Sequence, residues 1–102
     1  MFEINGETYV LKYNLKRVEL IENAVGMPTM AELNEHKGLF GLSALKTYFA
    51  YGLKKEGAEV FVPPKKGMEM AEALIEKEGY VAVNGAVLEA LERDCPFFFQ
   101  GA

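Results

Sequence analysis

Residues 2–26 read FEINGETYVLKYNLKRVELIENAVG, and within them an alternating apolar pattern gives way to a helical one. Asn5-Gly6 separates two short alternating segments, and Asn-Gly is the preferred pair in a two-residue type I′ turn. From Asn14, a good N-cap residue, apolar side chains recur at helical spacing as far as Gly26. Gly26 stands where a left-handed C-cap ends a helix. This stretch therefore predicts a β-hairpin followed by a helix.

The remaining chain shows mostly helical patterns separated by glycine and proline. Thr29 and Glu32 match a capping box at the start of a short helix over 29–36. Gly38-Leu39-Phe40-Gly41 reads as a flexible, partly apolar hinge. Three further helices are expected: from Leu42 or Ser43 to Lys55, from Lys65 to Lys77, and from Asn84 as N-cap to near Arg93.

These patterns predict a mainly α fold, in which an N-terminal β-hairpin precedes a small bundle of three to four helices. We expect one domain, with the hairpin over 1–13, the helical bundle over 14–95 and an apolar C-terminal tail over 96–102. The chain has 102 residues, half of them hydrophobic, which suits one modest core. Gly52 lies within an apolar helical stripe and predicts a close helix–helix approach.

Composition argues against most enzyme classes. One Cys and one His cannot form a disulfide framework or a structural zinc site, and we expect no catalytic residues, metal or cofactor. The net charge of −4 and the presence of only two arginines make nucleic-acid binding improbable. The N-terminus does not have the pattern of a signal peptide, and no apolar run approaches the roughly 20 residues of a membrane span. We expect a cytoplasmic protein.

Several polar side chains are candidates for chemistry, but each has a simpler interpretation. An acidic row on the helix over 65–77 is typical of a solvated helix face. His36 has no assembled nucleophile set and is typical of an exposed loop. Cys95 precedes a proline, and a buried structural cysteine is favoured over a reactive thiol. The acidic row is Glu69, Glu72 and Glu76, and the four linker lysines, too few for a phosphate surface, are Lys54, Lys55, Lys65 and Lys66.

Phe97-Phe98-Phe99 is the least ordinary feature of the sequence. In an extended tail, successive side chains face opposite sides, so at least one of these rings is expected to be exposed. Exposed large apolar surface usually indicates a partner or self-association. The alternative is a tail folded wholly back onto the helices. We take Phe97, Phe98 and Phe99, with Leu39 and Phe40 at the hinge, as the predicted protein-binding residues.

The order of these features resembles that of the tail assembly chaperones of long-tailed bacteriophages, prophages and related gene-transfer particles. The resemblance spans nearly the whole chain, and its motifs are structural. The matching features are the opening Phe2-Glu3-Ile4-Asn5-Gly6-Glu7 with Tyr9 and Leu11, the helix ending Ile21-Glu22-Asn23-Ala24-Val25-Gly26, a central helix starting near Ser43, an acidic helix ending at Gly79, and the final helix Val87-Leu88-Glu89-Ala90-Leu91.

The resemblance implies a mainly α-helical protein without enzymatic activity. Such chaperones coat the long, helical tape measure protein, help to recruit the tail tube protein, self-associate, and leave before the virion matures. The methionines of the present chain are adaptable contacts that suit a client of varied sequence. We therefore expect an amphipathic helical client to bind along apolar grooves.

Two other functions stay open at this level. One is a small phage or host regulator that binds nucleic acid or a polymerase subunit, for which salt-sensitive DNA binding would be diagnostic. The other is a minor structural protein of the virion, which purified particles would retain.

Overall fold

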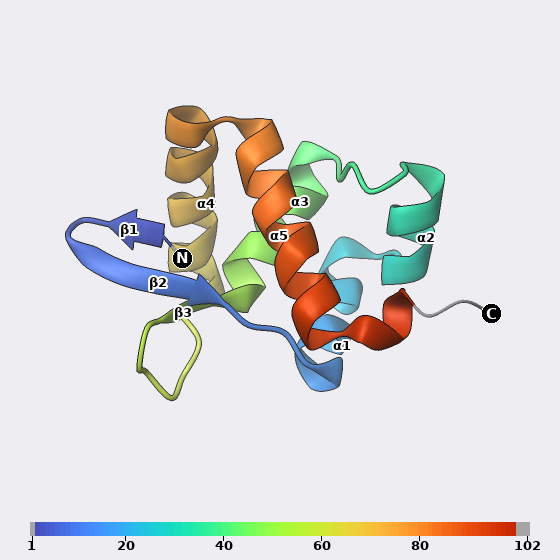
Figure 1. Ribbon diagram of the computed structural model, residues 1–102, viewed down its shortest axis with the longest axis horizontal. Helices are drawn as coiled ribbons and strands as arrows, with labels where there is room; N and C mark the ends of the chain where they lie inside the picture. The colour runs from blue at the N-terminus through green and yellow to red at the C-terminus, as the bar shows by residue number, and fades with distance from the viewer. Residues whose placement is uncertain (1, 100–102) are drawn as a thin grey trace.

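The computed structural model describes residues 2–99, and its fold is mainly helical, with an N-terminal hairpin as expected (Figure 1). Within this part of the chain there are five α-helices, one at each of the five segments with a helical pattern, whereas the bundle was expected to hold three to four. The elements are β1 (Phe2–Ile4), β2 (Glu7–Leu11), α1 (Leu15–Val25), α2 (Thr29–Glu35), α3 (Leu42–Gly52), β3 (Leu53–Lys55), α4 (Pro64–Glu78), α5 (Tyr80–Asp94) and a final 3₁₀ turn, η1 (Pro96–Phe98).

The N-terminal hairpin has the predicted turn. Strands β1 and β2 are antiparallel, with Ile4 opposite Glu7 on either side of the turn. Asn5 and Gly6 both have positive φ, 53° and 79°, as a type I′ turn requires. Helix α1 also begins and ends as predicted, because the Asn14 side chain accepts a hydrogen bond from the Arg17 N–H and Gly26 is left-handed.

The predicted helix to Lys55 is too long. Helix α3 ends at Gly52, because Leu53–Lys55 instead form the third strand, antiparallel to β2. This pairing places Leu53 opposite Leu11, and both side chains are buried. The backbone pairing and the burial of Leu53 together outweigh the helical pattern of the sequence.

The close helix–helix approach occurs at a different glycine. A Cβ on Gly52 would lie 2.5 Å from Cζ of Tyr13, so the neighbour of Gly52 is a tyrosine ring and not another helix. A Cβ on Gly67 of α4 would lie 2.7 Å from the carbonyl oxygen of Ala50 in α3. Gly67 therefore allows α4 to pack closely against α3, the central helix, which also contacts α1 and α5.

Helix α2 forms, but not through the predicted capping box. Pro28 precedes the helix, and Thr29 is fully buried. The Thr29 hydroxyl is 2.7 Å from the hydroxyl of Tyr48, and its backbone N–H donates to a carboxylate oxygen of Glu22. Glu32 contacts Nδ1 of His36 at 3.3 Å. The threonine thus joins α2 to α3, because the phenol of a buried tyrosine needs a hydrogen-bond partner.

Candidate functional site

The C-terminal phenylalanines form a short turn at one end of the molecule. Pro96 ends the helix, and the backbone N–H groups of Phe98 and Phe99 donate to the carbonyls of Cys95 and Pro96. Phe98 packs against the core, while Phe97 and Phe99 are each 43% exposed. The prediction that at least one ring is exposed is confirmed, and the wholly folded-back tail is wrong.

Two hollows flank this turn, and both are lined by Phe98. The first lies against α1 and has a volume of about 450 Å³; the second lies against α2 and has a volume of about 310 Å³. The α1 hollow is lined by Leu15, Val18, Glu19, Glu22, Phe97 and Phe98. The α2 hollow is lined by Met30, Leu33, Asn34, Lys37, Gly38, Leu88, Glu92, Phe98 and Phe99.

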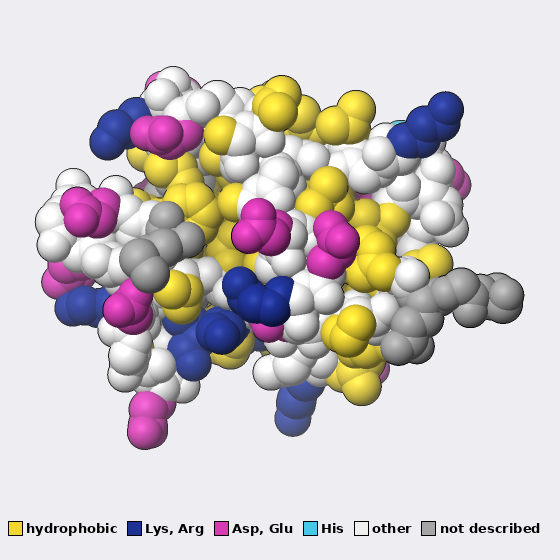
Figure 2. Space-filling model, viewed as in Figure 1, with side chains coloured by type: hydrophobic (Ala, Val, Ile, Leu, Met, Phe, Trp, Pro, Cys, Tyr) yellow, Lys and Arg dark blue, Asp and Glu magenta, His cyan; other side chains and the backbone are white. Residues whose placement is uncertain are grey.

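We call the apolar side chains of these two hollows the aromatic surface: Leu15, Val18, Met30, Leu33, Leu88, Phe97, Phe98 and Phe99. Figure 2 shows hydrophobic side chains gathered on this side of the molecule, beside α5 and the C-terminal segment. Leu15 and Met30 are exposed like the two outer phenylalanines. Covering either outer phenylalanine would contribute about 1 kcal/mol, since roughly half of its surface is still in contact with water.

The hinge residues divide into one exposed and one buried side chain. Leu39 is 56% exposed and follows Gly38, which lines the α2 hollow. Phe40 was predicted to contact a partner, and this is wrong: it is only 2% exposed. Its ring packs on Tyr48 with the ring centroids 4.6 Å apart. The structure thus leaves the Leu39 side chain exposed, although it lines neither hollow, and buries Phe40 in the core.

Asn84 explains the position of this loop. It was predicted as a helix N-cap, but α5 begins at Tyr80 and Asn84 is buried within it. Its side-chain oxygen accepts a hydrogen bond from the N–H of Phe40 at 3.1 Å, and its amide nitrogen donates to the carbonyl of Gly38 at 2.8 Å. The Tyr80 hydroxyl donates to the carbonyl of Phe40. Helix α5 therefore holds the loop by three hydrogen bonds, which sequence spacing could not reveal.

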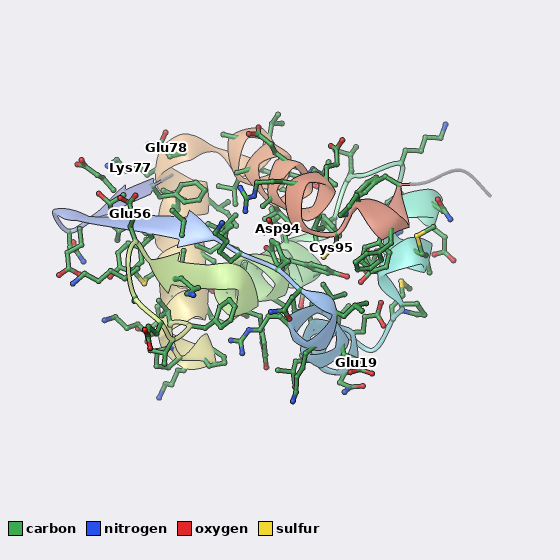
Figure 3. All side chains as sticks on the ribbon, turned by 60° about the horizontal axis from the view of Figure 1, so that its bottom comes forward. Glu19, Glu56, Lys77, Glu78, Asp94 and Cys95 are labelled. Carbon is green, nitrogen blue, oxygen red and sulfur yellow. The ribbon has the colours of Figure 1, made fainter. Side chains whose placement is uncertain are left out.

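The start of the C-terminal turn is attached to the hairpin. Asp94 accepts hydrogen bonds from the backbone N–H of Tyr13 at 3.0 Å and from the Arg93 side chain, which also donates to the carbonyl of Leu11. Burial alone would raise the pKa of Asp94, but the bonds from Arg93 and Tyr13 outweigh it and lower the pKa. Figure 3 shows Asp94 and Cys95 at this junction.

A second apolar groove, which the sequence did not suggest, lies between the hairpin and the helices α4 and α5. Phe2 lines both of its hollows, of about 360 and 350 Å³. Small alanine side chains from one face of α5 line its wall. Both acidic and basic side chains lie at its margin. The wall residues are Ala82, Ala86 and Ala90, and the charged residues are Glu3, Lys77, Glu78, Glu89 and Arg93. We call it the sheet groove; three acids and two bases border its apolar surface.

The other predicted polar candidates do not line the two hollows of the aromatic surface. The acidic row on α4 is exposed, as is His36, and Cys95 is buried, all as expected. Burial, and then the Asp94 carboxylate, raises the pKa of the Cys95 thiol. Residues 2–99 contain no group of three or more acidic, histidine or cysteine side chains that could hold a metal ion. No helix in this range has the length and apolar character to cross a membrane.

The aromatic surface is the arrangement best suited to a function, because it combines exposed rings with two hollows of side-chain size. It can bind apolar side chains of another protein, and its margin carries carboxylates. Comparison with protein-family models, with curated proteins and with solved structures finds no match.

Proposed function

We propose that this chain is a non-enzymatic tail assembly chaperone of a long-tailed phage or prophage. In this proposal it binds the tape measure protein, assists the addition of tail tube subunits, and self-associates. It acts in the cytoplasm of the bacterial host and is absent from the finished particle. The order of its elements supports the phage assignment by resemblance.

The observation that carries the proposal is the aromatic surface. Monomeric proteins rarely leave large apolar side chains grouped around hollows unless a partner covers them. Phe97 and Phe99 stand out from a turn that is fixed by Pro96 and by its own hydrogen bonds. Little conformational freedom is then lost when a partner covers these rings, which favours binding. Met30 adds an adaptable contact for a client whose sequence varies along its length.

The test is a pull-down of the tagged chain from phage-producing cells, followed by mass spectrometry. We expect the tape measure protein to be recovered, and the variant Phe97→Ser/Phe99→Ser to recover much less of it. Losing about 2 kcal/mol of binding free energy would weaken binding about 30-fold. A matched control is Leu20→Ser/Val60→Ser, which also removes two exposed apolar side chains, both outside the two hollows.

Other results would point to the other two functions. Recovery of nucleic acid or a polymerase subunit in place of the tape measure protein would identify a regulator. Retention of the chain in purified particles would identify a structural component of the virion. Undiminished recovery of the tape measure protein by Phe97→Ser/Phe99→Ser would show that the aromatic surface is not the binding site.

A further inference from the structure

The margin of the aromatic surface is predominantly acidic. Glu19 and Glu22 of α1 line the α1 hollow, and Glu92 of α5 lines the α2 hollow. Among the lining residues within 2–99, Lys37 is the one base. The sheet groove is closer to balance, because three acids and two bases line its two hollows. The aromatic surface therefore has the greater excess of acids over bases of these two grooves.

Two of these carboxylates are available to a partner. Glu19 and Glu92 are exposed, and neither takes part in an ion pair or side-chain hydrogen bond with another residue of 2–99. Figure 3 shows Glu19 at the outer edge of α1. Glu22 has a structural role as well, because one of its oxygens accepts the N–H of Thr29 at 2.7 Å. Glu22 is thus held in place by a hydrogen bond within the protein, whereas Glu19 and Glu92 are available to pair with a partner.

From this arrangement we infer that the occupant of the aromatic surface is an amphipathic α-helix of another protein whose apolar stripe is bordered by Lys and Arg. The inference rests on the proposed function and adds the chemistry of the client. A helix presents apolar side chains at i, i+3, i+4 and i+7, so successive anchors can enter the hollows on either side of Phe98.

The carboxylates at the margin are the reason to expect basic residues beside the apolar stripe of the client helix. Lysine or arginine beside the stripe would lie against Glu19, Glu22 and Glu92, where the neighbouring apolar side chains reduce screening by water. A helix with an acidic border would place like charges together, which is unfavourable. An anionic membrane surface would be repelled for the same reason, although the exposed rings alone would suit it. The margin thus selects a basic helix.

The direct test uses two synthetic helical peptides of about 20 residues with the same leucine stripe, long enough to form a helix in isolation. One carries Lys beside the stripe and the other carries Glu. Fluorescence anisotropy with the full chain at low salt should show the Lys-bordered peptide binding about tenfold more tightly, since each exposed pair contributes modestly. The preference should diminish as salt is added.

Charge-reversal variants then show which carboxylates cause the preference for the Lys-bordered peptide. Glu19→Lys/Glu92→Lys should reverse the preference, so that the Glu-bordered peptide binds more tightly. Glu69→Lys/Glu76→Lys makes the same change in net charge on α4, which lies at the opposite end of the molecule from the C-terminal segment (Figure 1). This control should leave the preference close to that of the native chain. A preference that both double variants change equally would reflect net charge alone and overturn the inference.

The outcomes separate this inference from the proposed function. If both peptides bind equally well and Phe97→Ser/Phe99→Ser weakens both, the aromatic surface binds helices but the basic border is wrong. If neither peptide binds and the Phe97→Ser/Phe99→Ser variant changes only the sedimentation of the chain, a second copy occupies the surface. If the chain binds neither peptide but binds anionic vesicles, the occupant is a membrane. The last two results overturn both the inference and the helical client.

Discussion

The loop over 38–41 and the turn over 96–99 both contain phenylalanine, and both were expected to present it to a partner. In the loop, three hydrogen bonds from α5 hold the backbone, and Phe40 points into the core. In the turn, the hydrogen bonds are local and none of them directs the outer rings inward. Phe97 and Phe99 consequently remain on the surface.

The difference shows that the polar groups around a phenylalanine decide its burial as much as its own hydrophobicity does. Phe40 could not enter the core unless its N–H and carbonyl found partners, since unpaired buried backbone groups are costly. Asn84 and Tyr80 supply these partners. Within residues 2–99, no side chain makes a comparable hydrogen bond to the backbone of Phe97 or Phe99, and these two rings stay exposed while Phe40 is buried.

The largest expected effect is that of truncating the buried ring. Phe40→Ala should lower the free energy of unfolding by about 3–5 kcal/mol, because it leaves a cavity beside Tyr48. Phe99→Ala removes the same atoms from a half-exposed position and should cost less than about 1 kcal/mol. Urea unfolding followed by circular dichroism measures both values. Equal losses would mean that the two rings are buried to the same extent in solution.

A smaller effect is expected from removing the amide that holds the loop. Asn84→Ala leaves the Phe40 N–H and the Gly38 carbonyl without partners and should cost about 2 kcal/mol. The N–H of Phe40 should also exchange with solvent much faster, which hydrogen exchange by NMR detects. Asn23→Ala, at an exposed position on α1, is the control and should change neither quantity. A Phe40 amide that stays protected in Asn84→Ala would show that Tyr80 alone holds the loop.

The parts of the fold that could be predicted are those with local causes. The hairpin turn depends on Asn5-Gly6, and α1 depends on Asn14 at one end and Gly26 at the other. Strand β3 has no such local signal, because Leu53–Lys55 become a strand only where β2 is available to pair with them. The same holds for Thr29, whose buried hydroxyl is placed by Tyr48.

The candidate site was predictable to a similar extent. The three consecutive phenylalanines after Pro96 were enough to predict that at least one ring of this segment is exposed. The hollows beside them did not, because each combines residues that are far apart in sequence, such as Leu15 with Phe97 and Met30 with Leu88. Asn84 was the missed residue, and its position within a helical apolar pattern was the available signal, since a buried asparagine must have partners.

The smallest expected effect concerns the attachment of the C-terminal turn to the hairpin. The hydrogen bonds to Asp94 lower its pKa from 3.8, so their contribution to stability is present above about pH 4 and is lost as pH falls through the folded-state pKa. Asp94→Asn should therefore be less stable than the native chain by about 1 kcal/mol at neutral pH, a modest value because Arg93 is half exposed to solvent. Thermal unfolding at a series of pH values should show this difference in stability becoming smaller towards pH 2. Glu92→Gln, at an exposed position two residues earlier in α5, should show a difference that is small at every pH. If Asp94→Asn remained equally destabilised at pH 2 and pH 7, the charge of Asp94 would have no part in holding the turn, and the exposed rings would be positioned by η1 alone.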